Sequence, residues 1–318
     1  MELASISNKN DNLVVGTHNG IFHKDEVVAI SILKILYENY KEVMVIRSRD
    51  LEYLKSNCNI LVDIGGGAFD HHQKGGNGSR SNGAKYASAG LVWKEFGNNL
   101  IHKLNASLNK EDIQKVWDEL DYYIIQEVDK EDNGQDYNDR LFNYITTFLP
   151  KWNEDNINYD EAFEKCVSIT TSVLKKEIET LISNVLAEKY VNEKLSNIDG
   201  NVLEIPSQTF PWLQLLTTAN ENGYSIDFVI FKYPAGGYAL QCVPKSLEDK
   251  FSQRISLPDS WAGETDNLPE ISGVKTAILC HNGKFFARAS KKEDIYKMCE
   301  LATKEYKENI SKQIKANN

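Results

Sequence analysis

Short, continuous apolar runs alternate with helix-like patterns along the first part of the chain. The runs at 13–15, 43–46 and 60–62 each end at a polar or glycine-containing turn, which is typical of buried β-strands. Between the first two runs, apolar residues recur at helical spacing from Val27 to Leu36, behind an acidic first turn. Strands without polar alternation, joined by a helix, indicate parallel β-α-β units. We therefore predict an α/β fold whose N-terminal domain is a doubly wound, mainly parallel sheet.

The longest regular pattern runs from Asp160 to Asn192, where apolar residues recur every three or four positions. It predicts a long helix that joins two lobes. Other patterns predict helices at 84–96, 110–131, 141–148 and from Lys292, and strands at 202–205, 227–233, 238–243, 276–280 and 285–289. We predict a first domain over 1–159, a linker helix over 160–195 and a smaller α/β domain over 196–318.

Composition places the chain among proteins that work outside the membrane. Of its 318 residues, 41% are hydrophobic and 26% charged, and no apolar run approaches the roughly 18 residues of a membrane span. The segment Met1 to Asn12 is polar and without arginine, so we expect a frayed tail and no signal or transit peptide. Five widely spaced cysteines fit reduced, buried thiols. We expect an intracellular, cytoplasmic protein with no membrane partner.

The charge is unevenly distributed. A formal net charge of −10 argues against a broad nucleic-acid-coating face. However, the stretch 71–94 contains basic and no acidic residues, and basic residues also predominate after Ser272. Two local basic zones in an acidic protein favour a small or short anionic ligand over a long duplex.

Four of the six histidines lie between positions 18 and 72. They alternate with aspartates at the expected strand ends and the start of the first helix: His18, His23, Asp25, Asp63, Asp70, His71 and His72. In a parallel sheet these loops face the same crevice. So many ligands exceed the needs of one closed zinc site and suit two divalent cations about 3.5–4 Å apart, with an aspartate between them. Imidazoles and carboxylates without cysteine favour Mn²⁺, with Fe²⁺ or Zn²⁺ as alternatives.

An ordered set of motifs resembles a known group of enzymes. Val62-Asp63 followed by Asp70-His71-His72 is similar to motifs of the DHH phosphoesterase superfamily, which includes RecJ-type exonucleases and manganese pyrophosphatases. The motifs at 16–26, 70–73, 88–92, 129–134, 241–245, 251–254 and 257–263 more closely resemble the family of the melanocyte proliferating gene product. The resemblance covers about residues 13 to 303.

This resemblance implies a DHH-like, metal-dependent hydrolase of phosphoesters, with members described as 3′–5′ RNA exonucleases. Matching motifs assign metal binding to His18, His23, Asp25, Asp63 and His71, with Asp63 as the bridge, and to one of Asp129 and Asp132. His72 would contact a phosphate oxygen, and Asp70 would orient an imidazole. The first motif departs from the superfamily pattern, because His23 occupies the place of an aspartate.

Basic residues complete the expected site. Lys74 and Arg80 in the glycine-rich loop and Lys245 and Arg254 in the second domain are the expected substrate contacts. Arg288 lies where the family has a glycine-rich stretch, and we expect it to supply an anion contact.

The favoured function is a metal-dependent phosphodiesterase, a 3′–5′ exonuclease acting on RNA or short oligonucleotides. One alternative is a hydrolase of a small phosphate compound such as pyrophosphate or a nucleotide. An alternative of another class is a non-catalytic, metal-stabilised scaffold. A second copy of the chain is kept open as a partner, in a homodimer.

Overall fold

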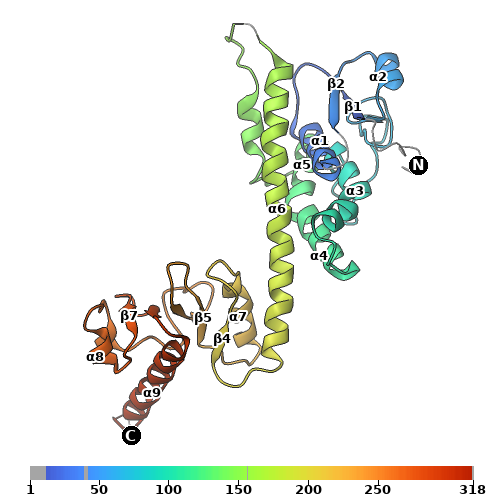
Figure 1. Cartoon of the computed structure of the whole chain (residues 1–318). Coiled ribbons are helices and arrows are strands. Elements are labelled where there is room, and N and C mark those ends of the chain that lie inside the picture. Colours follow the sequence, from blue (N-terminus) through green and yellow to red (C-terminus); the bar gives the residue numbers. More distant parts are fainter. Residues whose placement is uncertain (1–11, 39–41, 156, 317–318) are drawn as a thin grey trace. The chain divides into compact units, whose positions relative to one another are not determined.

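The computed structural model describes residues 12–38, 42–155 and 157–316. The chain divides into two compact units, Met1–Val185 and Leu186–Asn318, and we describe each by itself (Figure 1). The frayed tail expected over residues 1–12 lies almost entirely outside the described residues. No helix within these ranges is long and apolar enough to cross a membrane.

A small parallel sheet forms the centre of unit 1. Its strands are β1 (Leu13–Thr17), β2 (Val43–Arg47) and β3 (Ile60–Leu61), in the order β2-β1-β3. The apolar runs predicted all three strands correctly. The chain moves from β1 to β2 in one direction and from β2 to β3 in the other. The carboxyl ends of β1 and β3 therefore flank the point at which ligands bind in such sheets.

Helices of unit 1 pack on this sheet and on each other. They are α1 (Lys24–Tyr37), α2 (Leu51–Asn57), α3 (Ser88–Leu104), α4 (Lys110–Leu120), α5 (Gln126–Asp132) and the first part of α6 (Tyr159–Leu195). The sequence pattern missed α2, because only one residue of this helix is buried. The helix predicted over 110–131 is interrupted by a π-helical turn, Asp121–Ile125, and a 3₁₀ helix, Asn143–Phe148, replaces the one predicted over 141–148.

Helix α6, predicted as a linker over 160–195, contributes apolar residues to the cores of both units. Its apolar residues from Phe163 to Val185 belong to the main core of unit 1, whereas Val191 and Leu195 belong to a core of unit 2. The boundary between the units therefore falls inside the helix. Burial of its apolar face in unit 1 explains the long periodic pattern.

Unit 2 contains a mixed sheet of five strands. These are β4 (Val202–Glu204), β5 (Phe228–Lys232), β6 (Tyr238–Cys242), β7 (Ala277–Cys280) and β8 (Phe286–Ala289), in the order β4-β5-β6-β8-β7. Only the β4–β5 pair is parallel. All five strands match runs identified in the sequence, so the fold is α/β in both units.

Both faces of this second sheet are covered. Phe228 and Ile230 of β5 point into a core shared with α9 (Lys292–Ala316), whereas Val229 and Phe231 point into a core shared with α7 (Trp212–Glu221). Period-two alternation of the side chains explains why β5 is apolar at every one of these positions. A short helix, α8 (Leu268–Ser272), and a 3₁₀ turn, Asp259–Trp261, complete the unit.

All five cysteines are free thiols. Four are buried, and burial raises their pKa values. The prediction of reduced, mostly buried thiols is confirmed.

Candidate metal centre

Histidines and carboxylates converge at the carboxyl ends of β1 and β3. His18 directly follows β1, and Asp63 follows β3 by two residues. His23 and Asp25 lie at the start of α1, and Asp132 is the last residue of α5. Chain segments far apart in the sequence therefore supply one cluster.

The ligand atoms form three overlapping groups, in each of which all the atoms lie within 4.8 Å of one another. The groups are His18, His23, Glu26 and Asp63; Asp63, His71 and His72; and His23, Asp25 and Asp132. Asp63 belongs to two groups, as a bridging carboxylate would. Of the residues expected to bind metal, Asp129 alone is in none of these groups.

Asp63 adopts a left-handed backbone conformation, with φ of 59°. Aspartate tolerates this region better than most residues, at a cost of about 1–3 kcal/mol. Its Oδ2 lies 3.2 Å from Nε2 of His18, and its Oδ1 lies 3.4 Å from Nε2 of His71. The hydroxyl of Ser88, the first residue of α3, donates to Oδ1 at 3.2 Å. The strained backbone thus directs both carboxylate oxygens into the cluster.

The two adjacent histidines have different environments. The His71 side chain is buried, and its Nε2 lies 2.8 Å from Oδ2 of Asp132. The His72 side chain is 64% exposed, and its Nδ1 lies 2.9 Å from Oδ1 of Asp70. Asp70 also accepts hydrogen bonds from the backbone amides of Gly66 and His72. Asp70 is therefore placed to fix the ring of His72.

Asp129 points away from the cluster, although its helix carries Asp132. Its carboxylate is fully buried and accepts hydrogen bonds from the Gly90 amide and from Arg80 Nη1, both at 2.8 Å. The close approach requires glycine, since a Cβ at position 90 would lie 1.8 Å from Asp129 Oδ2. The motif left two candidate ligands, and of these two only Asp132 belongs to a group of possible ligand atoms.

Arg80, expected to contact the substrate, is instead buried in ion pairs. Its side chain is 6% exposed and pairs with Asp121 through two hydrogen bonds as well as with Asp129. The guanidinium is occupied by carboxylates of α5 and the π-helical turn, so it is not available to a phosphate. Lys74, by contrast, is exposed two residues after His72.

The three basic residues expected from unit 2 also differ in their surroundings. Lys245 and Arg254 line one cavity, where Arg254 Nε donates to Asp227 Oδ1 at 2.9 Å. Arg288 lies on β8, stacks 3.9 Å from the centre of the Tyr233 ring and donates to the Gly236 carbonyl. Both of these contacts are with the turn that joins β5 and β6.

The cluster has an excess of buried negative charge. Burial, together with the charges of Asp63 and Asp132, raises the pKa of Asp25 well above its usual range. Burial would lower the pKa of His18, but the carboxylates of Asp63 and Glu26 raise it to about 10. Burial likewise opposes the effect of Asp132 and Asp63 on His71, whose pKa is also about 10. Positive charge is therefore strongly favoured at this point.

Two buried atoms test whether these residues fit a metal. Within the described residues, Oδ1 of Asp25 and Nε2 of His71 have no partner with hydrogen-bond geometry. Buried polar atoms are normally satisfied. Imidazole nitrogens and carboxylate oxygens together form a donor set for Mn²⁺, Fe²⁺ or Zn²⁺. The cluster therefore fits divalent cations.

Glu26 is the residue that the sequence reasoning missed. It lies in the same group as His18 and Asp63, and its carboxylate accepts from the backbone amide of His23 at 2.9 Å. The His23-x-x-Glu26 spacing is that of a helix capping box, which offered a purely structural explanation. Burial of the whole first turn of α1 is what brings Glu26 into the cluster.

Known proteins match this chain over nearly its whole length. The model for MYG1 exonucleases, described as uncharacterised protein family UPF0160, matches residues 14–303. Human MYG1 exonuclease is 29% identical over 93% of this chain and 88% of its own length. The MYG1 protein of Dictyostelium discoideum is 27% identical over 86% of this chain and 91% of its own length.

A solved structure of RecJ with Mg²⁺ from Thermus thermophilus also matches, at 12% identity over 91% of this chain and 48% of that chain. The TM-score is 0.25. The family match covers well over half of the residues and includes every group of the metal centre. The chain therefore belongs to the MYG1 exonuclease family.

Proposed function

We propose that this protein is a divalent-metal-dependent phosphodiesterase, acting as a 3′–5′ exonuclease on RNA or short oligonucleotides. The position of Asp63 carries the proposal, because its carboxylate belongs to two groups of ligand atoms at once. Such sharing is typical of two-cation sites that hydrolyse phosphoesters. The name of the human relative supports exonuclease activity.

Two divalent cations, which we propose to be Mn²⁺, would be held by the groups that share Asp63 and His23. When bound, they supply an activated water and neutralise charge on the phosphoryl oxygens. The residues that we propose to bind the two cations are His18, His23, Asp25, Glu26, Asp63, His71 and Asp132.

His72 is proposed to bind the scissile phosphate. Because its Nδ1 is held by Asp70, its Nε2 is left for a phosphoryl oxygen of the substrate. Its exposure, beside the buried His71, suits a group that meets a ligand from solvent. Lys74 lies in the same loop and is proposed as a second, outer phosphate contact.

The start of α3 orients the carboxylates. The amide of Ser88 donates to Asp25 Oδ2 at 3.3 Å, and its hydroxyl donates to Asp63. The positive end of the helix dipole favours negative charge at this point. Ser88 thereby keeps both carboxylates in place and leaves their other oxygens for cations.

A hydrolase of a small phosphate compound is the second candidate. Tyr86 and Trp93, the aromatic residues near the basic loop, are 8% and 0% exposed and belong to the core. Unit 1 therefore lacks these two rings as platforms for a base, which favours a compact phosphate ligand. The substrate panel below separates the two candidates.

Asp63→Asn tests the proposal. Asparagine also tolerates a left-handed backbone, so the change removes charge without adding strain. We expect Mn²⁺-dependent turnover to fall at least a hundredfold, with an unchanged circular dichroism spectrum. Asp118→Asn, on the exposed surface of α4, is the matched control and should retain activity.

Short RNA, short DNA, pyrophosphate and nucleoside phosphates form the substrate panel, each with Mn²⁺ and with chelator. Turnover that ignores the chelator, or full activity in Asp63→Asn, contradicts the proposal. One tightly held ion per chain without turnover supports a metal-stabilised scaffold instead.

A further inference from the structure

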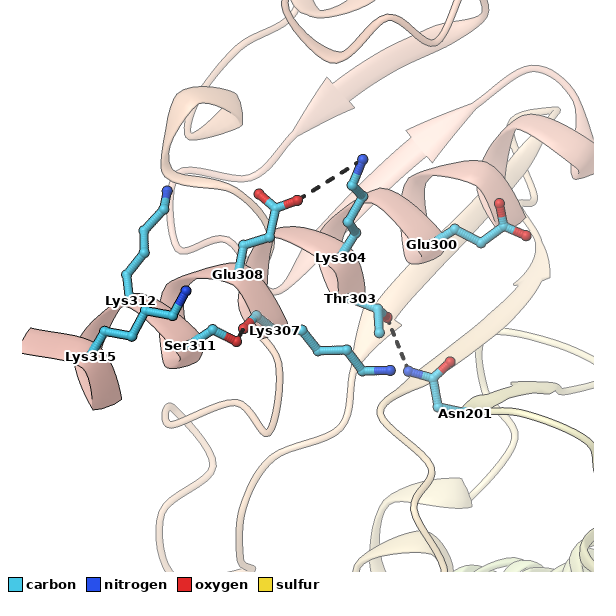
Figure 2. Close-up of a pocket in the computed structure, with 9 residues that line it drawn as sticks. All are labelled: Asn201, Glu300, Thr303, Lys304, Lys307, Glu308, Ser311, Lys312 and Lys315. Carbon is cyan, nitrogen blue, oxygen red and sulfur yellow. Dashed lines mark hydrogen bonds and ion pairs between the residues drawn. The ribbon is translucent and has the colours of Figure 1, made fainter. Parts of the chain in front are cut away.

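A basic groove runs beside α9 in unit 2. Two cavities form it, and they adjoin because both are lined by Asn201, Thr303 and Lys307. Figure 2 shows the Lys307 side chain extended toward Asn201, with Lys312 and Lys315 farther along the helix. We call this the α9 groove. It lies where α9 leaves the core, since the last buried residue of this helix is Ala302.

The groove carries positive charge that the rest of unit 2 does not neutralise. Its lining contains six basic and three acidic side chains. Two of the cations have partners, Arg254 with Asp227 and Lys304 with Glu308. Within the described chain, Lys307, Lys312 and Lys315 form no ion pair. These three lysines are therefore available to an anionic ligand.

Exposed aromatic rings accompany these lysines. Tyr306 lines the groove and is 41% exposed. Phe251 is 94% exposed on a hairpin whose two ends supply Lys245 and Arg254 to the lining. Exposed rings of this kind can stack on unpaired bases. Aromatic rings interleaved with cations are typical of surfaces that bind single strands.

We propose that the α9 groove binds single-stranded nucleic acid, with the phosphates on Lys307, Lys312 and Lys315 and unpaired bases against Tyr306 and Phe251. The three lysines span about 12 Å of helix. A duplex hides its base faces from aromatic rings, and an acidic peptide has none to stack. The identification of this strand with the substrate rests on the proposed function.

Binding without catalysis provides the test. The full chain is titrated into fluorescein-labelled 12-nucleotide RNA in chelator, and anisotropy is recorded over a range of salt concentrations. We expect the Lys307→Glu/Lys312→Glu double variant to bind at least tenfold more weakly. The slope of log K against log salt should fall by about 0.7 for each phosphate that the variant no longer neutralises. Tyr306→Ala and Phe251→Ala should each weaken binding about fivefold or more.

Lys297→Glu reverses the charge of one lysine on the same helix but outside the groove, half the charge change of the double variant, and should bind as the wild type does. Unchanged affinity in the double variant overturns the proposal, as does equal weakening by Lys297→Glu. Preferential binding of duplex RNA or of polyglutamate also overturns it. Because no metal is present, these results do not depend on hydrolysis, so failure here and failure of Asp63→Asn are separate findings.

Discussion

The two aspartates near the end of α5 should respond in opposite ways to the same substitution. Asp129→Asn is expected to lower stability while leaving every cation ligand in place. Asp132→Asn is expected to abolish metal-dependent turnover with little loss of stability. The two residues are three positions apart, but only Asp132 reaches the cluster, at 2.8 Å from His71.

The expected cost of Asp129→Asn follows from its contacts. An asparagine oxygen can still accept from the Gly90 amide, but the side-chain amide then faces the guanidinium of Arg80, donor against donor. One charge-assisted hydrogen bond is lost, at about 1.5–3 kcal/mol. The orphaned donors bring the total to about 2–4 kcal/mol, because Asp121 still partners Arg80. For a unit of this size, the melting temperature should fall by roughly 4–16 °C.

Asp132→Asn removes the partner of His71, but it also removes a charge that disfavours ionisation of Asp25. Because these two effects oppose each other, the metal-free chain should lose less stability than it does with Asp129→Asn. Thermal melting in chelator measures both variants. Metal content after gel filtration and Mn²⁺-dependent turnover complete the comparison.

The opposite pattern would contradict the roles assigned to the two aspartates. A stable Asp129→Asn protein with reduced metal content would make Asp129 a ligand. An active Asp132→Asn protein would remove Asp132 from the site. Loss of stability in both variants would mean that α5 has a structural role alone.

Three further outcomes follow from the same contacts. Gly90→Ala places a Cβ 1.8 Å from an Asp129 oxygen and should cost about 2–4 kcal/mol in urea unfolding, whereas Gly67→Ala, with nothing within 4 Å, should change stability by less than about 1 kcal/mol. Lys24→Met leaves the carboxylate of Asp139 buried without its cation and should cost about 3–5 kcal/mol in urea unfolding. Mn²⁺ at a hundred times its dissociation constant should raise the melting temperature by about 5–11 °C over chelator, and an unchanged temperature would argue against a metal centre.

Hydrophobic periodicity predicted the strands and the long helices because burial determines both. The apolar runs before Gly16 and Asp63 are core strands, and the repeat in α6 is its buried face. The pattern failed for α2, which buries only Leu54, and for the π-helical turn. Helix periodicity does not distinguish a π-helical turn from a continuous α-helix when tertiary contacts decide the local winding.

The site could be predicted only as far as position along the chain implies position in space. His18 and Asp63 follow adjacent parallel strands, so their proximity was predictable. The choice between Asp129 and Asp132 could not be predicted, because the two residues lie about one turn apart on the same helix. It depends on Arg80, which reaches Asp129 from a loop 49 residues away. From the sequence we predicted that Arg80 contacts a phosphate, because no neighbouring residue in the sequence indicates its buried partners.

The departure at His23 has a compensating counterpart in the structure. In the DHH pattern that the sequence resembles, an aspartate stands where this chain has His23, so the proposed ligand set carries one negative charge fewer. Glu26 restores a carboxylate to the same group, one helical turn further along α1. Because its oxygens also accept from the His23 amide, the residue that supplies the charge holds the start of the helix as well. Glu26→Gln would keep an oxygen for the His23 amide but remove the charge, so its effect should be on cation affinity more than on folding.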